Sequence, residues 1–384
     1  MSKKILVLGA GHVGKAIAID LAGKHKVTTA DIDHKSLEYL SAGYQIETVK
    51  INFIMTRDEI KNLVKDYDLI VSAVPGFMGF EILRSIIEAG KDIVDISFMP
   101  EDFMELNDLA IRNGVTAITD CGVAPGMPNL VAGYYNERME IDNFEYYVGG
   151  LPKIREYPFY YKAPFSPIDV IEEYIRPARY KENGKVVTKP AMSDPELMFF
   201  DDVGTLEAFF TDGLRSLLQN LPNVPNMKEK TLRYPGHIDI IKVLKAAGFL
   251  DHDPVTIYNT GIRPIDFTGK LLVKGWELKP NEPEFTVMRI IVEGKKNNMN
   301  QSIIYYLYDE YDDKEKLSSM ARTTGFVATA CAELIFEDLF SRKGVFPLEI
   351  IGKDEKCFKY VMQYQEERNI KYKITKQNKP IEEM

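Results

Sequence analysis

The sequence predicts an α/β fold, with a doubly wound parallel sheet at the N-terminus followed by a second, α+β domain. Over about the first 120 residues, short apolar runs bounded by glycine alternate with stretches of helical periodicity. This is the pattern of parallel strands joined by crossover helices. A glycine-rich turn separates the first apolar run from the first helical stretch. Beyond about residue 126 the alternation gives way to aromatic and β-branched runs, which are typical of a mostly antiparallel sheet.

Each element of the first domain has its own local signal. Short apolar runs predict buried strands, and apolar residues three or four positions apart predict the helices that cover them. Strands are expected at residues 4–8, 26–30, 69–73, 92–96 and 115–118, and helices at 12–23, 57–65, 78–89 and 102–113.

The second domain is expected to contain three β-prone stretches, which begin near Tyr146 and cover residues 285–293 and 302–308. We interpret Leu206–Phe209 as a helix-like run within this domain. Residues 318–340 are rich in small side chains at helical spacing. Because such a helix can pack closely, we expect it to return to the first domain.

The composition indicates an ordinary globular chain of 384 residues. Its 57 Asp and Glu residues outnumber its 48 Lys and Arg residues, which gives a net charge of −9. Nucleic acid and anionic membranes are therefore not expected as partners. Cys121, Cys331 and Cys357 lie too far apart for a metal-ligand spacing, so no metal is expected. Few cysteines, no signal-peptide pattern and no run of ~18 apolar residues predict a cytoplasmic protein.

The glycine-rich turn reads Gly9-Ala-Gly-His-Val-Gly14 and matches GxGxxG in its usual context, between a strand and a helix. Gly9 permits a tight turn, Gly11 lets the backbone approach a pyrophosphate, and Gly14 allows close helix–strand packing. His12 and Val13 open the helix, whose N-terminal N–H groups and dipole favour phosphate. The motif predicts a dinucleotide-binding Rossmann domain. A chance glycine turn and an FAD site are the alternatives.

A carboxylate at the end of the second strand indicates which dinucleotide is bound. Asp31 can accept hydrogen bonds from the ribose hydroxyls of the adenosine, and its charge would repel a 2′-phosphate. Asp33 follows closely, and no arginine stands beside it. The predicted cofactor is NAD rather than NADP.

Further cofactor contacts are expected from the loops at the carboxyl ends of the strands, which line the crevice in doubly wound folds. Val74 and Pro75 follow the strand at 69–73, and Ser97 and Phe98 follow the next strand. We assign Val74, Pro75 and Ser97 to the cofactor, and Phe98 to the substrate beside the nicotinamide. A purely structural loop is the alternative.

Six further segments occur in an order and spacing that are together more specific than any one of them. They are Asp120-Cys-Gly-Val-Ala-Pro-Gly126, Val148-Gly-Gly-Leu-Pro152, Leu206-Glu-Ala-Phe209, Arg233-Tyr-Pro-Gly-His237, Ala321-Arg-Thr-Thr-Gly325 and Gly344-Val-Phe-Pro347. With them the chain resembles the saccharopine dehydrogenase-like superfamily, and within it the L-lysine 6-dehydrogenase branch, over nearly its whole length.

One position of the resemblance bears on the substrate. Saccharopine reductases and carboxynorspermidine dehydrogenases usually have Asp-Pro-Gly, with the Asp on the substrate, where this chain has Ala124-Pro125-Gly126. In the lysine dehydrogenase branch, the corresponding segment resembles Val123-Ala-Pro-Gly126 of this chain. The resemblance implies that Val123 lies near the cofactor and Ala124 near the substrate. The resemblance then implies NAD-dependent oxidative deamination of the ε-amine of L-lysine, giving ammonia, NADH and a semialdehyde that cyclises to a piperideine carboxylate. The alternatives are a saccharopine- or carboxynorspermidine-type dehydrogenase of a secondary amine and a non-catalytic NAD-sensing protein.

This chemistry requires a neutral amine and an anchored carboxylate. His237 is the first candidate for the base because it titrates near neutrality, and Arg233 is the candidate clamp for the substrate carboxylate. Tyr160, in an aromatic and Pro-flanked loop, is expected in the catalytic tunnel, and Thr211 is expected to hold an amino group. The alternatives are a structural hydrogen bond for His237, an ion pair for Arg233 and ordinary packing for Tyr160. Nucleophilic catalysis by Cys121 is a further alternative.

The expected division of the chain follows from these assignments. It is 1–125 for the NAD-binding domain, 126–317 for a substrate-binding and dimerisation domain, and 318–384 for a C-terminal helical segment. The charged end of the chain, from Lys373, is expected to be loose. The second sheet is the expected surface of a homodimer, and the partner in binding is a small amino-acid substrate.

Overall fold

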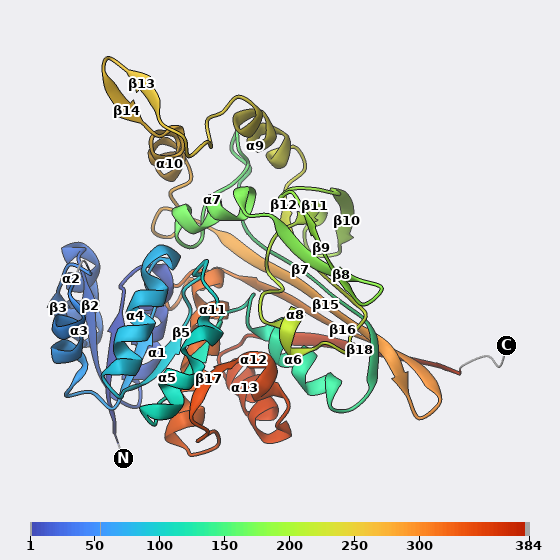
Figure 1. Cartoon of the computed structure of the whole chain (residues 1–384), viewed down its shortest axis with the longest axis horizontal. Coiled ribbons are helices and arrows are strands. Elements are labelled where there is room, and N and C mark those ends of the chain that lie inside the picture. Colours follow the sequence, from blue (N-terminus) through green and yellow to red (C-terminus); the bar gives the residue numbers. More distant parts are fainter. Residues whose placement is uncertain (1, 54, 381–384) are drawn as a thin grey trace. The chain divides into compact units, whose positions relative to one another are not determined.

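The computed structural model describes residues 2–53 and 55–380 and divides into two compact units (Figure 1). The first unit contains the chain up to Met139 together with Met320–Lys371. The second contains Glu140–Ser319 together with the chain from Tyr372. Among the helices of the described ranges, none is long and apolar enough to cross a membrane.

The first unit is built on a seven-stranded sheet with the strand order β17-β6-β5-β4-β1-β2-β3. Every neighbouring pair in this sheet runs parallel. The chain fills the sheet in opposite directions from β1 and β4, which defines a doubly wound sheet, and the predicted fold class is confirmed. The strands are β1 (Lys4–Leu8), β2 (Lys26–Asp31), β3 (Glu47–Lys50), β4 (Leu69–Ser72), β5 (Asp92–Asp95), β6 (Thr116–Thr119) and β17 (Gly344–Pro347).

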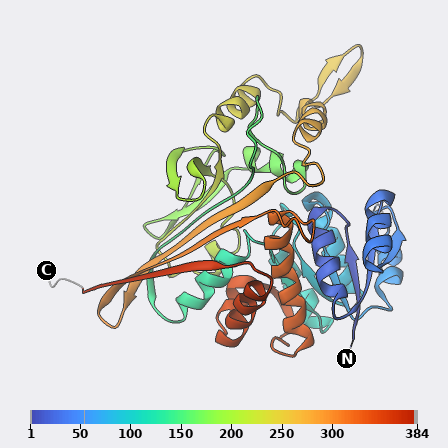
Figure 2. The same ribbon diagram turned by 180° about the vertical axis from the view of Figure 1, so that it is seen from behind.

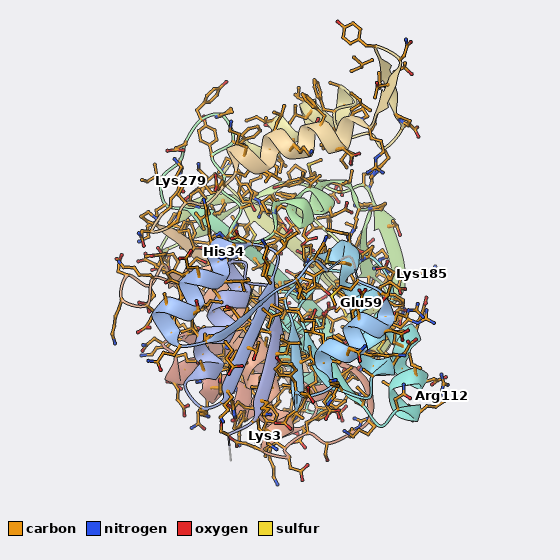
Figure 3. The ribbon with its side chains drawn as sticks, turned by 90° about the vertical axis from the view of Figure 1, so that its left-hand side faces the viewer. Lys3, His34, Glu59, Arg112, Lys185 and Lys279 are labelled. Atoms are coloured by element: carbon orange, nitrogen blue, oxygen red, sulfur yellow. The ribbon has the colours of Figure 1, made fainter. Side chains whose placement is uncertain are left out.

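The crossover helices of the first unit bury apolar stripes, as Ile17 and Leu21 do in the first of them. Two elements were missed by the sequence analysis, and both have weak patterns. The helix that begins at His34 buries two leucines, and β3 has an exposed and half-buried pattern throughout; Figure 3 shows His34 and Glu59 at the surface of this unit. The helices are α1 (His12–Ala22), α2 (His34–Tyr44), α3 (Arg57–Val64), α4 (Gly76–Glu88), a 3-10 turn (Phe103–Leu106), α5 (Asn107–Arg112) and α6 (Met127–Asn136).

The C-terminal part of the chain returns to the first unit, as predicted from its small residues. Helix α11 (Ser319–Phe336) packs so closely that a Cβ on Gly325 would lie 3.2 Å from Ile17 and 3.3 Å from Ala16 of α1. Strand β17 then extends the parallel sheet beside β6. It is followed by α12 (Leu348–Gly352) and α13 (Glu355–Glu367), which Figure 2 shows beside α11.

The boundary between the units differs from the predicted one at residue 125. It falls at Met139, because α6 packs tightly within the first unit. A Cβ on Gly133 would lie 2.0 Å from the carbonyl oxygen of Glu349, and one on Gly352 would lie 2.1 Å from that of Leu130. Such close helix contact depends on glycines in both helices and cannot be read from either segment alone.

The expectation of a loose C-terminal end was wrong for the residues that the structure describes. Tyr372–Pro380 forms strand β18, which pairs antiparallel with β16 (Met299–Glu310) in the second unit (Figure 2). A lysine-rich sequence is usual on an edge strand, where the backbone supplies the pairing and the charges prevent further association. The segment 318–384 is therefore shared between the units, and residues 381–384 lie outside the described part.

The second unit contains a nine-stranded sheet with the main order β10-β11-β12-β7-β15-β16-β18, to which β8 and β9 are attached through β12. Its pairs are antiparallel except for β12 and β7, which run parallel. This agrees with the predicted mostly antiparallel sheet. The strands not yet given are β7 (Glu140–Pro152), β8 (Ala178–Glu182), β9 (Lys185–Lys189), β10 (Glu196–Phe200), β11 (Gly204–Phe210), β12 (Asn226–Arg233) and β15 (Glu284–Lys296).

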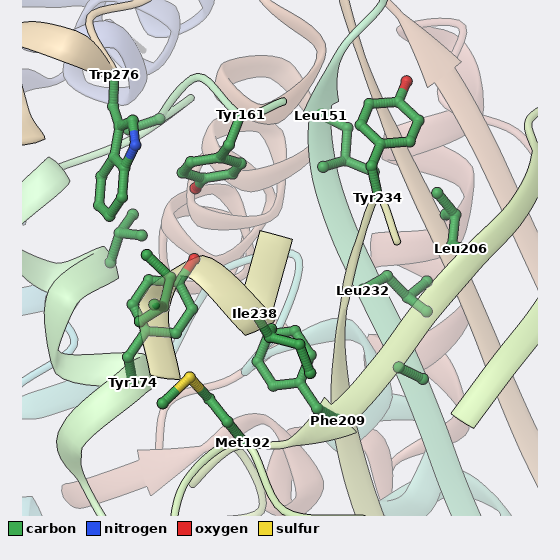
Figure 4. Close-up of a cluster of buried hydrophobic side chains, with 14 of the residues drawn as sticks. Leu151, Tyr161, Tyr174, Met192, Leu206, Phe209, Leu232, Tyr234, Ile238 and Trp276 are labelled. Atoms are coloured by element: carbon green, nitrogen blue, oxygen red, sulfur yellow. The ribbon is translucent and has the colours of Figure 1, made fainter. Parts of the chain in front are cut away.

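The interpretation of Leu206–Phe209 as helix-like was wrong, because these residues lie in β11. Leu206, Ala208 and Phe209 are buried in the core of the second unit (Figure 4), and pairing with β12 outweighs the helical propensity of the segment. The same core takes in residues from three helices of the unit, α7 (Pro167–Ile175), α9 (His237–Ala246) and α10 (Pro264–Gly275). The unit also contains the short helix α8 (Leu217–Asn220).

Candidate functional site

The predicted glycine turn joins β1 to α1, and the three glycines have distinct roles. Gly9 has φ +103°, and a Cβ there would lie 2.4 Å from the carbonyl oxygen of Ala73. A Cβ on Gly14 would lie 2.1 Å from the carbonyl oxygen of Gly9. At Gly11, by contrast, no atom of the described chain lies within 4 Å of such a Cβ. Gly9 and Gly14 are thus required by the fold, whereas Gly11 leaves room for a ligand.

The opening of α1 suits an anion. Its first turn contains His12, Val13 and Gly14 and so has no carboxylate. His12 is exposed and Val13 half-buried, and the N–H groups of a first helical turn point out of the helix toward any bound phosphate. These features fit the pyrophosphate of a dinucleotide.

Asp31 ends β2 next to this turn. Its Oδ2 accepts a hydrogen bond from the backbone N–H of Ala10, and its Oδ1 accepts one from the N–H of Asp33 at 2.8 Å. The carboxylate is therefore held at the turn, and each oxygen keeps lone pairs for a further donor. Asp33 has a different role: its side chain accepts from the N–H groups of Lys35 and Ser36 and caps α2.

The predicted strand-end residues lie at the same edge of the parallel sheet. Val74 is buried, and Pro75 precedes α4. Ser97 is also buried and donates its hydroxyl to Asp95 Oδ1 at 2.6 Å, while Phe98 is half-buried. Ser97 is therefore engaged with a carboxyl that the sequence analysis did not single out. Burial raises the pKa of Asp95 to about 7, against the stabilising effect of the Ser97 hydrogen bonds.

The loop after β6 contains the two other predicted contact residues. Val123 is buried and Ala124 is half-buried. Gly126 has φ +142°, and a Cβ there would lie 1.8 Å from the carbonyl oxygen of Gly122, so the loop requires glycine at this position. The N–H of Gly126 donates to Asn129 Oδ1 at 3.1 Å. The loop that presents Val123 and Ala124 is therefore fixed by its own backbone.

The alternative of nucleophilic catalysis by Cys121 is not favoured. Its side chain is fully buried, and burial, together with the neighbouring Cys331, raises the pKa of the thiol well above its usual value. A buried thiol of this kind stays protonated and unreactive.

In the second unit, Arg233 ends β12 inside a polar network. Its guanidinium donates to Glu173 Oε2 at 2.7 Å, to the Tyr174 hydroxyl at 3.1 Å and to the Tyr161 hydroxyl at 3.4 Å. Arg233 is 2% exposed, whereas the Glu173 side chain is 18% exposed. The predicted carboxylate clamp thus already holds a carboxylate, which belongs to the chain itself.

His237, the first residue of α9, is fully buried in the same network. Its Nδ1 lies 2.8 Å from the carbonyl oxygen of Phe159 and must donate to it, so Nε2 accepts from the Tyr174 hydroxyl at 2.8 Å. Burial and the charge of Arg233 lower the pKa of His237 to about 3. Both ring nitrogens are engaged and the ring is neutral, which favours the structural hydrogen bond over proton transfer.

The aromatic loop contributes Tyr161 rather than Tyr160 to this network. Tyr160 is half-buried at φ +52° and packs edge-on against Tyr157. Tyr161 is 3% exposed and lies against both Arg233 and Trp276; Figure 4 shows the Tyr161 and Tyr174 hydroxyls directed toward each other. The signal that would have distinguished the two tyrosines is tertiary, since both follow the same proline.

Thr211 follows β11 and makes its contacts with a second buried carboxyl, Glu229 of β12. The Thr211 hydroxyl lies 2.8 and 2.7 Å from the two Glu229 oxygens and 2.8 Å from Thr231 Oγ1. Glu229 also accepts from the N–H of Gly213 at 3.0 Å. Burial raises the pKa of Glu229 to about 8, although the Thr211 hydrogen bond opposes the shift.

Glu229→Gln is expected to change how stability depends on pH. In the unfolded chain a glutamate ionises near ~4.3, so between that value and about 8 the folded state holds the extra proton. The free energy of unfolding of the wild type therefore falls as pH rises, by up to roughly 1.4 kcal/mol per pH unit. Glutamine does not ionise, so the variant should gain at least about 1 kcal/mol on the wild type between about pH 6 and about pH 8.

Urea unfolding at a series of pH values measures this difference directly. Glu196→Gln is the matched control, because the Glu196 side chain is 44% exposed, although its partner Lys230 is only 6% exposed. Parallel curves for the wild type and Glu229→Gln would show that Glu229 is ionised in the folded chain over this range.

Taken together, the fold and the first site define a dinucleotide-binding protein of the Rossmann type with a second, sheet-based unit. Known families agree with this class. The saccharopine dehydrogenase NADP binding domain matches residues 5–118, and the saccharopine dehydrogenase C-terminal domain matches residues 122–370. The chain therefore belongs to the saccharopine dehydrogenase family.

Individual relatives share modest identity with the chain. Alpha-aminoadipic semialdehyde synthase of Rattus norvegicus is 25% identical over 65% of the chain, which spans 29% of that larger protein. A saccharopine dehydrogenase [NADP(+), L-glutamate-forming] of Pyricularia oryzae is 29% identical over 66% of the chain and 59% of its own length. Carboxyaminopropylagmatine dehydrogenase of Synechocystis is 21% identical over 91% of the chain and 93% of its own length.

A solved structure shows the same fold. The apo saccharopine dehydrogenase (L-Glu forming) of Saccharomyces cerevisiae superimposes with a TM-score of 0.78 at 18% identity, over 98% of this chain and all of that one. The two-unit architecture is therefore that of the family.

Proposed function

We propose that the chain is an amine dehydrogenase that uses NAD, with the ε-amine of L-lysine as its first substrate to test. The observation that carries the proposal is the turn around Gly11, which the fold leaves open for a dinucleotide, in a chain of the saccharopine dehydrogenase family. The dinucleotide supplies the acceptor for a hydride from the carbon that bears the amine. The protein must then hold the amine neutral and exclude side reactions.

The preference for NAD rests on Asp31. Two backbone N–H groups fix its carboxylate beside the turn, in a position where it would accept ribose hydroxyls and repel a 2′-phosphate. The named relative from Pyricularia oryzae uses NADP(+), so the coenzyme has to be tested and not transferred. Lys15 is a neighbouring cation whose charge interacts with Asp33 and Asp31. A cation there would attract a 2′-phosphate and so favours NADP.

Two substrate classes compete. At its expected contact with the substrate, Ala124 presents only a methyl group. An apolar contact of this kind suits a plain primary amine better than a substrate with further polar groups. The Synechocystis relative, similar along nearly its whole length, is named for a secondary amine that bears a guanidino group. This likeness favours the secondary-amine alternative, which is the second candidate.

For the proton acceptor we infer Glu173 in place of His237. His237 is fully buried and both of its ring nitrogens are already engaged, so it has no lone pair open to a substrate proton. Glu173 is partly exposed, and burial raises its pKa, while the contact with Arg233 opposes that rise. In this proposal Arg233 and Tyr174 position Glu173, and His237 holds Tyr174 through its neutral ring.

The deciding experiment is a screen for NADH or NADPH formation with the purified chain. Lysine, ornithine, saccharopine and carboxyaminopropylagmatine would each be tested with both coenzymes, and ammonia and glutamate would be measured in the product. Lysine-dependent NADH with stoichiometric ammonia supports the proposal. Glutamate formed from saccharopine alone would replace it with the secondary-amine candidate. Coenzyme binding with no turnover of any amine would favour the non-catalytic NAD-sensing alternative.

We also place the protein in the cytoplasm. All three cysteines are unpaired and buried, which favours a reducing compartment. Fractionation of the native host, with detection by antibody, tests this assignment.

A further inference from the structure

Three polar side chains lie side by side where neighbouring strands of the parallel sheet end. Ser72 of β4 is paired in register with Asp95 of β5. The register of β5 with β6, which pairs Val94 with Ile118, places Asp95 beside Thr119 at the next position. Side chains at matched positions of parallel strands point to the same face of the sheet, so these three form one row.

The row is fully buried and incompletely paired. Ser72, Asp95 and Thr119 are each 0% exposed. Within the described ranges, no hydrogen bond of good geometry reaches Asp95 Oδ2, although the Ser72 hydroxyl is near enough to lower the pKa of the carboxyl. The groups that act on this pKa are two serines and Asp120, none of them a cation. Asp95 is therefore a desolvated carboxyl without a compensating charge.

The other oxygen of Asp95 holds the segment that follows β5. Its Oδ1 accepts from the backbone N–H of Ser97 at 3.0 Å and from the Ser97 hydroxyl at 2.6 Å. A Cβ on Gly79 of α4 would lie 2.1 Å from Ser97 Oγ, so the serine also packs closely against the helix. Asp95 therefore fixes Ser97 and the start of the segment that continues to Phe98.

The row lies in the half of the crevice opposite the expected adenosine site. In the sheet, β1 stands between β4 and β2, and β2 ends at Asp31. A Cβ on Gly9 of the glycine turn would lie 2.4 Å from the carbonyl oxygen of Ala73, the residue after Ser72. A dinucleotide with its diphosphate at this turn and its adenosine at Asp31 directs its other half toward β4 and β5. The nicotinamide ring is therefore expected on the side of Asp95.

We propose that Asp95 makes the coenzyme site selective for oxidised NAD, by releasing its proton to solvent when that form binds. This inference rests on the proposed function, in which the chain uses a nicotinamide coenzyme. The nicotinamide ring of oxidised NAD is a cation, whereas that of NADH is neutral. An ionised carboxyl in a desolvated site attracts the cation and gains nothing from the neutral ring. By linkage, the bound cation and the ionised carboxyl favour each other, and the carboxyl regains a proton from solvent once NADH has formed.

The surroundings of Asp95 allow this response near neutral pH. Burial raises the pKa of Asp95 to about 7, and the hydrogen bonds from Ser97 oppose the rise. The charge of the buried Asp120 acts in the same direction as burial. Cys121 stays a neutral thiol because its own pKa is raised. The charged residues of α4, which covers this face of the sheet, form ion pairs with one another or with α3; they are Glu81, Arg84 and Glu88.

Isothermal titration of the full chain with oxidised NAD and with NADH tests the proposal. Between about pH 5.5 and about pH 8.5, the affinity for oxidised NAD should rise about tenfold, the order of magnitude for one desolvated charge pair. The affinity for NADH should not rise with it. At about pH 7, titrations in two buffers of different ionisation enthalpy should show roughly 0.4 proton released per oxidised NAD, the fraction that a tenfold linkage implies for a half-protonated group.

The comparison of the two redox forms separates Asp95 from other titrating groups. His12 opens α1, and its charge acts on the diphosphate, which both forms carry equally. A group of this kind shifts both affinities together. The difference between the two curves therefore reports a group that senses the charge of the nicotinamide ring.

Three variants assign that difference to a residue. Asp95→Asn keeps an acceptor for Ser97 but cannot ionise, so it should bind oxidised NAD at every pH as weakly as the wild type does at the lowest. Ser97→Ala removes a hydrogen bond that lowers the pKa of Asp95, so the midpoint of the curve should move to higher pH. Asp92→Asn is the matched control, because Asp92 begins the same strand and pairs with Lys343. It should retain the wild-type curve.

The outcomes separate this inference from the proposed function. If Asp95→Asn keeps the wild-type pH dependence, or if both redox forms respond equally, the selectivity does not come from Asp95 and the amine dehydrogenase assignment stands. A wild type that binds neither form at any pH overturns both. Should Asp95→Asn fail to fold, as judged by circular dichroism, the Ser97→Ala midpoint decides, and an unchanged or lower midpoint overturns the inference.

Discussion

Arg233→Met is expected to lower the free energy of unfolding by about 3–5 kcal/mol, because it removes one partner of a buried charge pair and leaves the other. Glu173, Tyr161 and Tyr174 would each lose a donor at 2.7–3.4 Å. The loss of stability should increase with pH. Without Arg233, the desolvated carboxylate of Glu173 is destabilising unless it binds a proton, and protonation becomes harder as the pH rises. Urea unfolding of the full chain at several pH values measures both effects.

Two further variants separate the buried pair from any surface pair. Arg233→Met combined with Glu173→Leu should recover most of the lost stability, because an apolar pair of similar volume avoids desolvating charges. Arg179→Met is the matched control: its partner is Asp212, and its side chain is 45% exposed, so the cost should stay below about 1 kcal/mol. Equal losses for Arg233→Met and Arg179→Met would contradict the network described here.

The same set tests the assignment of Glu173. The double variant, if stable, should still bind NAD but lack amine oxidation, whereas Glu173→Gln should retain the fold and lose turnover at all pH values. A Glu173→Gln variant with wild-type kcat would show that another group takes the proton.

Asp31→Asn is expected to weaken NAD binding by about 10- to 100-fold, which is the range for losing hydrogen bonds to a charged acceptor. Binding of NADP should weaken less or improve, because the repulsion of the 2′-phosphate is removed. The ratio of kcat/KM for the two coenzymes should therefore move toward NADP. Isothermal titration with each coenzyme measures the binding without depending on the amine.

Asp33→Asn provides the matched control for this prediction. The two aspartates lie two residues apart, but Asp33 caps α2, and asparagine is an equally good capping residue. Asp33→Asn should therefore leave both stability and coenzyme preference almost unchanged. If Asp31→Asn and Asp33→Asn shifted the preference equally, the discrimination would come from the summed charge and not from the fixed carboxylate.

Local patterns predicted the first unit well. The strand-turn-helix around Gly9–Gly14, the carboxylate at Asp31 and the strand ends at Val74 and Ser97 are close in sequence to the elements that position them. A short βαβ motif has few ways to fold, because the glycines and the buried strand fix the turn. The elements α2 and β3 were missed because neither has a strong apolar periodicity.

The second unit depended on contacts between distant segments. The sequence made Arg233 the candidate clamp and His237 the candidate base, but their partners Glu173, Tyr174 and Phe159 lie 60, 63 and 78 positions away from the residues they contact. Neither residue could be given a role until those partners were known. Thr211 illustrates the same point, since its hydroxyl is taken by Glu229, 18 positions further on.

By itself, the sequence determined the class of fold, the dinucleotide turn and the carboxylate beside it, because each depends on residues within one βαβ unit. Tertiary structure alone decided that Asp95 and Glu229 are buried and Glu173 is half-buried, each with a raised pKa. It also decided that His237 is neutral and that Tyr372–Pro380 is a strand. The physical reason is that burial and charge pairing are properties of the assembled chain. A side chain acquires its pKa and its hydrogen-bond partners only when segments far apart in the sequence exclude water around it.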